Sequence, residues 1–143
     1  MLVVFDTNVI ISALYSKNGA SFRLLRAALA GELSYALSPL IAWEYEGQIL
    51  RKTAQGFLKG RNEDYERLLD AICAIAVPTW DPFQIRPILG DVSDDKILEC
   101  AIAGRCSHII TFNKRDFPAT ITVGYGIEVM TPGEFLRTWR AQT

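Results

Sequence analysis

The sequence lacks most of the features that mark a disulfide-bonded, membrane-spanning or nucleotide-binding protein. Its three cysteines are an odd number without a CxxC pair, which argues against a disulfide scaffold or a cysteine-rich zinc site. No apolar run approaches the roughly 20 residues of a membrane helix, and the N-terminus has no basic signal-peptide region. Neither a P-loop nor a glycine-rich dinucleotide fingerprint is present. We therefore expect a cytoplasmic protein with no membrane segment.

An excess of charge of either sign is also missing. Fifteen lysines and arginines face 16 aspartates and glutamates, which gives a net charge of −1. This balance argues against a protein that merely coats nucleic acid, but it is compatible with an enzyme that acts on one. Half of the 143 residues are apolar. We therefore expect one domain over residues 1–143, with a core large enough to fold without disulfides.

Short apolar runs alternate with segments of helical periodicity along the chain. The predicted strands are Leu2–Phe5, Ser34–Leu37, Val77–Trp80, His108–Phe112 and Ile127–Met130. The predicted helices are Val9–Tyr15, Ala20–Ala30, Pro39–Leu50, Asn62–Ala76, a helix capped by Ser93–Asp95 that runs to Ala103, and Pro132–Arg140. Arg51–Gly60 and Asp81–Gly90 are expected to be exposed connections. The alternation predicts an α/β fold with a central, mostly parallel sheet flanked by helices on both faces.

Two acidic residues follow predicted strands directly. Asp6 ends the first strand, and Asp116 lies in the tight turn after His108–Phe112. Because ligands bind beyond the carboxyl ends of the strands in an open parallel sheet, both carboxylates should project at the same edge. Each on its own is also explained by ordinary turn chemistry.

Two further acidic residues lie on the apolar side of predicted helices. Glu44 falls between Leu40 and Ile41 on the core-facing arc of its helix, where a lone buried carboxylate is costly. Asp95 borders the apolar stripe of the next helix, although helix caps also favour aspartate. Asp94 is the neighbouring alternative to Asp95, and Asp91 lies just upstream.

Four carboxylates at one edge would repel each other unless a cation joined them. An all-oxygen cluster without cysteine or histidine suits one or two Mg²⁺ or Mn²⁺ ions, which lower the pKa of a bound water and orient it for attack on phosphorus. Neutral side chains that could support such a cluster are Thr7, Asn8, Thr111 and Asn113. Candidate contacts to a phosphate backbone are Arg51, Lys52, Lys114 and Arg115, although solvated basic residues are the simpler interpretation of the first two.

The ordered set of these motifs resembles the PIN-domain family, in particular its toxin components of toxin–antitoxin systems. The motifs are Asp6-Thr7-Asn8, Ser38-Pro39 with Glu44-Tyr45, Asp94–Leu98, Thr111–Phe117 and Thr131–Leu136. The resemblance implies a Rossmann-like PIN fold and a metal-dependent endoribonuclease whose acidic quartet is Asp6, Glu44, Asp95 and Asp116. It also implies an RNA substrate, a cognate antitoxin protein and a homodimer.

Two other functions remain open at this point. A phosphoacceptor or phosphatase-like domain also uses Mg²⁺ and acids at strand ends, although a phosphatase of that type has a second aspartate where this chain has Asn8. A non-catalytic module could keep the PIN fold and act only through a partner, but the complete set of acids speaks against it.

Overall fold

A five-stranded parallel sheet forms the centre of the computed structural model, which describes residues 1–80 and 92–142. The strand order is β3-β2-β1-β4-β5, so the first strand of the chain lies in the middle of the sheet. The strands are β1 (Leu2–Phe5), β2 (Ser34–Leu37), β3 (Val77–Pro78), β4 (His108–Ile110) and β5 (Glu128–Met130). The parallel sheet confirms the predicted fold class.

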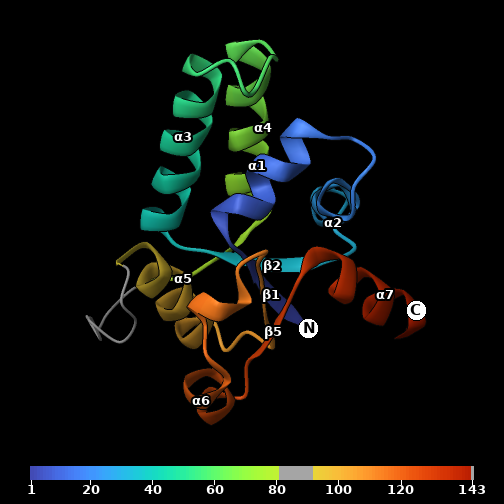
Figure 1. Ribbon diagram of the computed structural model, residues 1–143, viewed down its shortest axis with the longest axis vertical. Coiled ribbons are helices and arrows are strands. Elements are labelled where there is room, and N and C mark those ends of the chain that lie inside the picture. Colours follow the sequence, from blue (N-terminus) through green and yellow to red (C-terminus); the bar gives the residue numbers. More distant parts are fainter. Residues whose placement is uncertain (81–91, 143) are drawn as a thin grey trace.

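Helices cover both faces of the sheet (Figure 1). They are α1 (Thr7–Tyr15), α2 (Ala20–Leu29), α3 (Pro39–Ala54), α4 (Asn62–Ile75), α5 (Val92–Ala103), the short α6 (Ala119–Thr122) and α7 (Pro132–Gln142). Two 3₁₀ turns flank α6: η1 (Lys114–Asp116) and η2 (Val123–Tyr125). Figure 1 shows α2 beside α7 on one side of the sheet, α5 on the other, and α3 and α4 projecting together as a pair. None of the helices described is long and apolar enough to cross a membrane.

The start of α3 follows from its sequence. Ser38 is the N-cap, and its Oγ accepts a hydrogen bond from the backbone N–H of Ile41 at 3.3 Å. Pro39 takes the first helical position, where its missing N–H costs nothing because that group would have no partner within the helix. This cap directs α3 away from the carboxyl edge of the sheet.

The end of α3 differs from the prediction, which placed Arg51 in an exposed connection. The helix continues to Ala54, because none of these added residues breaks a helix and Thr53 Oγ1 donates to the carbonyl of Ile49 at 2.7 Å. The chain turns only at Gly56, whose φ of 78° is a conformation that favours glycine.

Other boundaries shift by a few residues. Helix α5 begins at Val92, so Asp94 and Asp95 lie inside its first turn instead of capping it. Strand β4 ends at Ile110, which leaves Thr111 and Phe112 in the turn beyond the sheet edge. The short helix α6 was not predicted, and the predicted connection Asp81–Gly90 lies outside the residues that the structure describes.

Candidate active site at the carboxyl edge of the sheet

Asp6 is held at the point where β1 passes into α1. Its backbone N–H donates to the carbonyl of Ile110 at 2.9 Å, which extends the β1–β4 pairing by one step. One carboxylate oxygen accepts from the N–H of Thr7 at 2.8 Å, and the other accepts from Thr111 Oγ1 at 2.7 Å. The buried Asp6 carboxylate is therefore fixed by donors from two strand ends.

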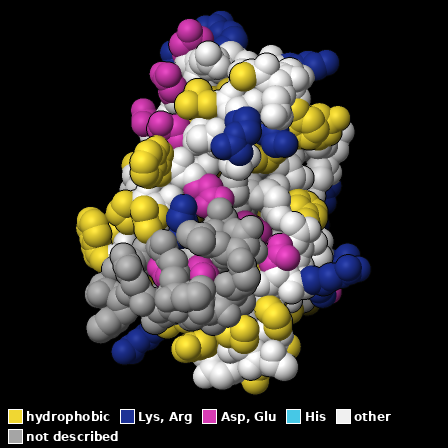
Figure 2. Space-filling view, turned by 60° about the vertical axis from the view of Figure 1, so that its left-hand side comes forward, with side chains coloured by type: hydrophobic (Ala, Val, Ile, Leu, Met, Phe, Trp, Pro, Cys, Tyr) yellow, Lys and Arg dark blue, Asp and Glu magenta, His cyan; other side chains and the backbone are white. Residues whose placement is uncertain are grey.

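The pKa of Asp6 is raised above its ordinary value of 3.8. Burial is the main cause, and the charges of Glu44 and Asp116 add to it, whereas the hydrogen bonds from Thr111 and Thr7 act in the opposite direction. Glu44 and Asp116 are thus close enough to Asp6 to act on its charge. Figure 2 shows acidic side chains near the middle of this face of the molecule, next to the residues that are not described.

Glu44 lies in the second turn of α3 and is half-buried, as its helical position indicated. Its neighbour Tyr45 is completely buried and donates its hydroxyl to the carbonyl of Phe5, the residue before Asp6. This hydrogen bond ties α3 to the end of β1. Among the described residues, the buried Oε2 atom of Glu44 has no hydrogen-bond partner.

The other two predicted acids differ in their surroundings. Asp116 is exposed in η1, whereas Asp95 is buried in the first turn of α5, which packs against β1, β4 and α3. Within residues 1–80 and 92–142, no group of three or more histidine, cysteine, aspartate or glutamate side chains is arranged to hold an ion. The joint assignment of Asp6, Glu44, Asp95 and Asp116 as metal ligands therefore stays a prediction. Asp91, and the side chain of Asp94, lie outside what the structure describes.

The predicted neutral residues surround Asp6. Thr111 is completely buried and accepts a hydrogen bond from the N–H of Asn113 at 3.0 Å while it donates to Asp6. Asn8 Oδ1 accepts from the N–H of Phe112 at 3.4 Å, and Thr7 is buried beside Asp6. The turn after β4 is thus connected to the start of α1 by side-chain hydrogen bonds.

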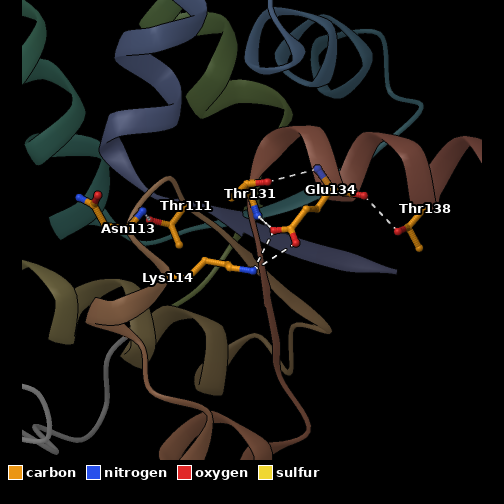
Figure 3. A network of polar contacts seen from close by, with 6 residues as sticks. All are labelled: Thr111, Asn113, Lys114, Thr131, Glu134 and Thr138. Atoms are coloured by element: carbon orange, nitrogen blue, oxygen red, sulfur yellow. Dashed lines mark hydrogen bonds and ion pairs between the residues drawn. The ribbon is translucent and has the colours of Figure 1, made fainter.

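Lys114, a predicted RNA contact, is engaged within the protein. Its Nζ atom lies 3.0 and 3.1 Å from the two carboxylate oxygens of Glu134 (Figure 3). Glu134 and Thr131 form a capping box at the start of α7: Thr131 N–H donates to Glu134 Oε1 at 2.9 Å, and Glu134 N–H donates to Thr131 Oγ1 at 3.2 Å. A phosphate at Lys114 would therefore compete with Glu134.

The hydrogen bonds of Glu134 lead to a prediction about how the stability of the fold depends on pH. The backbone N–H of Thr131, followed by Lys114, lowers the pKa of Glu134 from 4.5 to about 2. Its charge therefore stabilises the fold above pH 4.5, and this contribution is lost as the pH falls through about 2. We expect Glu134→Gln to lower the free energy of unfolding by roughly 0.5 kcal/mol at pH 7, because the ion pair is partly exposed.

Urea unfolding followed by circular dichroism at pH 7, 4 and 3 checks this expectation, and the difference between the two proteins should shrink with each step. Glu66→Gln, on the exposed side of α4, is the matched control and should show no such trend. A constant difference at all three pH values would contradict the role given to the Glu134 charge.

The remaining predicted RNA contacts lie on two separate parts of the surface. Arg115 is exposed in η1 beside Asp116, and Arg51 is exposed near the end of α3. Lys52 is half-buried, with its Nζ atom 5.5 Å from the centre of the Phe57 ring. Contact of these residues with RNA stays a prediction.

The family model for the PIN domain matches residues 2–115 of the chain. The chain belongs to the PIN-domain family. The match covers β1, α3 and β4 and ends one residue before Asp116. No curated protein matches the chain. The resemblance predicted from the sequence motifs is thus confirmed at the level of the family.

The PIN domain also resembles a solved structure. A chain in the crystal structure of VapBC2 from Rickettsia felis, bound to a DNA fragment from their promoter, superposes with a TM-score of 0.59. The two chains are 15% identical over 90% of this chain and 98% of the other. At this identity the similarity shows a shared fold.

The contribution of Tyr45 to the site of this PIN domain was not predicted. The helical pattern puts Tyr45 on the buried side of its helix together with Ile41 and Ile49. It does not predict which group the Tyr45 hydroxyl binds. Helical periodicity predicts which side chain is buried, whereas a contact to Phe5, 40 residues away, depends on how α3 packs against the sheet.

Proposed function

We propose that this PIN domain is a divalent-metal-dependent endoribonuclease, the toxin of a toxin–antitoxin pair. The observation that carries the proposal is the position of the buried Asp6 carboxylate at the carboxyl edge of the sheet, with Glu44 and Asp116 from two other elements close enough to help raise its pKa. Membership of the PIN-domain family supports the same chemistry. Asp95 is proposed as the fourth acid.

The residues fit a hard divalent cation. The donors are carboxylates, which Mg²⁺ and Mn²⁺ prefer. Glu44 has a buried oxygen without a hydrogen-bond partner among the described residues, and the charge on Asp6 is disfavoured mainly by burial and further by Glu44 and Asp116. A cation would give the Glu44 oxygen a partner and would stabilise the charge on Asp6. We therefore propose that Asp6, Glu44, Asp95 and Asp116 hold one or two ions. When bound, such an ion supplies positive charge for the phosphate and activates water for hydrolysis of the phosphodiester.

The chain itself contributes orientation. Thr111 and the N–H of Thr7 hold the two oxygens of Asp6 in fixed directions, so this carboxylate needs little reordering when its ligand arrives. The hydroxyl of Tyr45 fixes α3, and with it Glu44, relative to β1. Arg115, exposed beside Asp116, is proposed to attract the RNA phosphate.

Cleavage of a panel of single-stranded and structured RNAs tests the proposal. We expect hydrolysis with Mn²⁺ or Mg²⁺ and at least about a hundredfold slower cleavage with EDTA, because the acids alone cannot neutralise the phosphate. RNA that stays intact at every metal concentration would contradict the proposed activity. Equally fast cleavage in EDTA would contradict the role of the metal.

A protein partner is part of the proposal. The similar Rickettsia felis structure is that of VapBC2 bound to a DNA fragment from their promoter. We propose that an antitoxin binds this chain and inhibits it, and that the active form is a homodimer. Co-expression with the protein encoded by the adjacent gene, followed by light scattering and a cleavage assay, tests both.

A further inference from the structure

Two aromatic side chains stack on the surface, one at the end of α1 and one in the connection that follows α3. The rings of Tyr15 and Phe57 lie 4.4 Å apart between centroids with an interplanar angle of 12°, yet they are 62% and 43% exposed as residues. Lys52 is 5.5 Å from the centroid of the Phe57 ring. A parallel pair of rings that remains this exposed leaves flat apolar surface in contact with water.

The pair borders a hollow of about 960 Å³ between the end of α1, the start of α2 and the connection from α3 to α4. Its charged lining consists of Lys17, Lys59 and Asp64, and Lys52 adds a third cation beside Phe57. The hollow is therefore locally positive, although the chain as a whole has a net charge of −1. Figure 2 shows basic and hydrophobic side chains above the acidic ones near the middle of this face, with further acidic side chains along its upper left.

A polar strip on α1 connects this hollow with the carboxylates. Asn8, Ser12 and Tyr15 share one side of α1, at spacings of four and three residues, and none of them is buried. Asp6 precedes the first of them and Tyr15 is the last. At the helical rise of about 1.5 Å per residue, the strip from Asn8 to Tyr15 is about 10 Å long.

A second strip on α3 runs alongside it. Glu44, Gln48 and Lys52 follow one another at intervals of four residues, and all are half-buried. Glu44 acts on Asp6 at one end, while Lys52 contacts the Phe57 ring, and through it Tyr15, at the other. Helix α1 packs against α3, Glu44 is close enough to Asp6 to affect its charge, and Tyr15 stacks on Phe57 beside Lys52, so we infer that both strips border the seam between the two helices.

We propose that Tyr15, Phe57 and Lys52 form a stacking platform that binds an unpaired base of single-stranded RNA, with the flanking nucleotides along the seam between α1 and α3. The ligand class in this inference rests on the proposed ribonuclease function. Aromatic faces beside lysines bind single-stranded nucleic acid because every base has a flat ring and every nucleotide a phosphate. The platform supplies the positive charge that the acidic end of the seam lacks.

The direct test is equilibrium binding without cleavage. Fluorescence anisotropy in EDTA would measure the affinity for a labelled, unstructured RNA of roughly ten nucleotides and for the same RNA as a duplex. We expect Phe57→Leu and Tyr15→Ala to weaken single-strand binding about tenfold, and Phe57→Trp to keep it. A plot of the logarithm of the binding constant against the logarithm of the salt concentration should be less steep for Lys52→Gln, by about 0.7 in slope.

Two controls separate base stacking from the docking of an apolar protein segment. Tyr125→Ala removes a tyrosine that is 51% exposed on η2 and should leave the affinity unchanged. Leucine keeps most of the apolar volume of Phe57 but has no flat ring. If the surface serves to dock an apolar protein segment and does not stack a base, Phe57→Leu should bind RNA with the wild-type affinity. That result, or duplex binding as tight as single-strand binding, would overturn the proposal.

The binding assay also keeps the platform distinct from the catalytic proposal. If the wild type cleaves RNA while Phe57→Leu binds and cleaves as the wild type does, the platform is wrong and the nuclease stands. If Phe57→Leu weakens RNA binding but no condition gives cleavage, the platform stands as an RNA-binding site and the nuclease is wrong. No RNA binding by the wild type overturns the platform outright.

Discussion

Replacing Asp6 by asparagine is expected to slow RNA cleavage at least about a hundredfold while the fold persists. Asparagine can still accept one hydrogen bond, from Thr7 or from Thr111, so the connection between β1 and α1 is kept. What is lost is the negative charge that acts together with Glu44 and Asp116. Initial cleavage rates in saturating Mn²⁺, with circular dichroism to compare folding, measure the effect.

The stability of the same variant should change in a way that depends on metal. Because the folded pKa of Asp6 is raised, its contribution to stability is largest below pH 3.8 and is lost as the pH rises through the folded value. At pH 7 in EDTA, Asp6→Asn should therefore be at least as stable as the wild type.

With Mn²⁺ the order should reverse. An ion that binds only the folded state raises the free energy of unfolding by about 2.7 kcal/mol at a concentration one hundred times its Kd. Asp6→Asn should lose most of this stabilisation. Thermal unfolding with and without Mn²⁺ measures both differences. Asp70→Asn, an exposed substitution on α4, is the matched control. Full cleavage by Asp6→Asn would refute the role of the acids.

Tyr45→Ala should give the largest loss of stability among the substitutions considered. Tyr45 is completely buried between α3 and the sheet, so truncation leaves a cavity and removes the hydrogen bond to Phe5. We expect the free energy of unfolding to fall by about 3–5 kcal/mol. Urea denaturation at pH 7 checks this value.

Tyr45→Phe separates the two contributions. It keeps the ring and leaves the carbonyl of Phe5 without its donor, so we expect a smaller loss of about 1–3 kcal/mol. Tyr125→Phe removes an exposed hydroxyl and should change little. Equal stability of Tyr45→Phe and the wild type would mean that the hydroxyl does not tie α3 to β1.

The sequence predicted those parts of the fold that depend on local pattern. The apolar run Leu2–Phe5 forms the central strand, and Ser38-Pro39 starts α3, because burial and capping act over a few neighbouring residues. The end of α3 was placed too early because the basic residues from Arg51 onward suggested a loop. Charge is no obstacle to a helix, and the chain turns only at Gly56.

The site was predicted only in part. Asp6 and Asp116 follow strands that are neighbours in the parallel sheet, which is as far as the topology goes; their joint role in a site stays a prediction. The stacking of Tyr15 on Phe57 was not predicted, because it joins the end of one helix to a loop 42 residues later and leaves no periodic signal. The ion pair of Lys114 with Glu134 was not predicted either, because the two residues are 20 positions apart and no periodic pattern links them.

The strand order has a consequence during translation. Strand β1 is made first but lies at the centre, and its partner β4 comes from residues 108–110, after more than 100 others. A nascent chain therefore exposes one edge of β1 until β4 has been synthesised. Since Asp116 follows β4 in the chain, the proposed site cannot be complete before this strand and the turn after it have been synthesised.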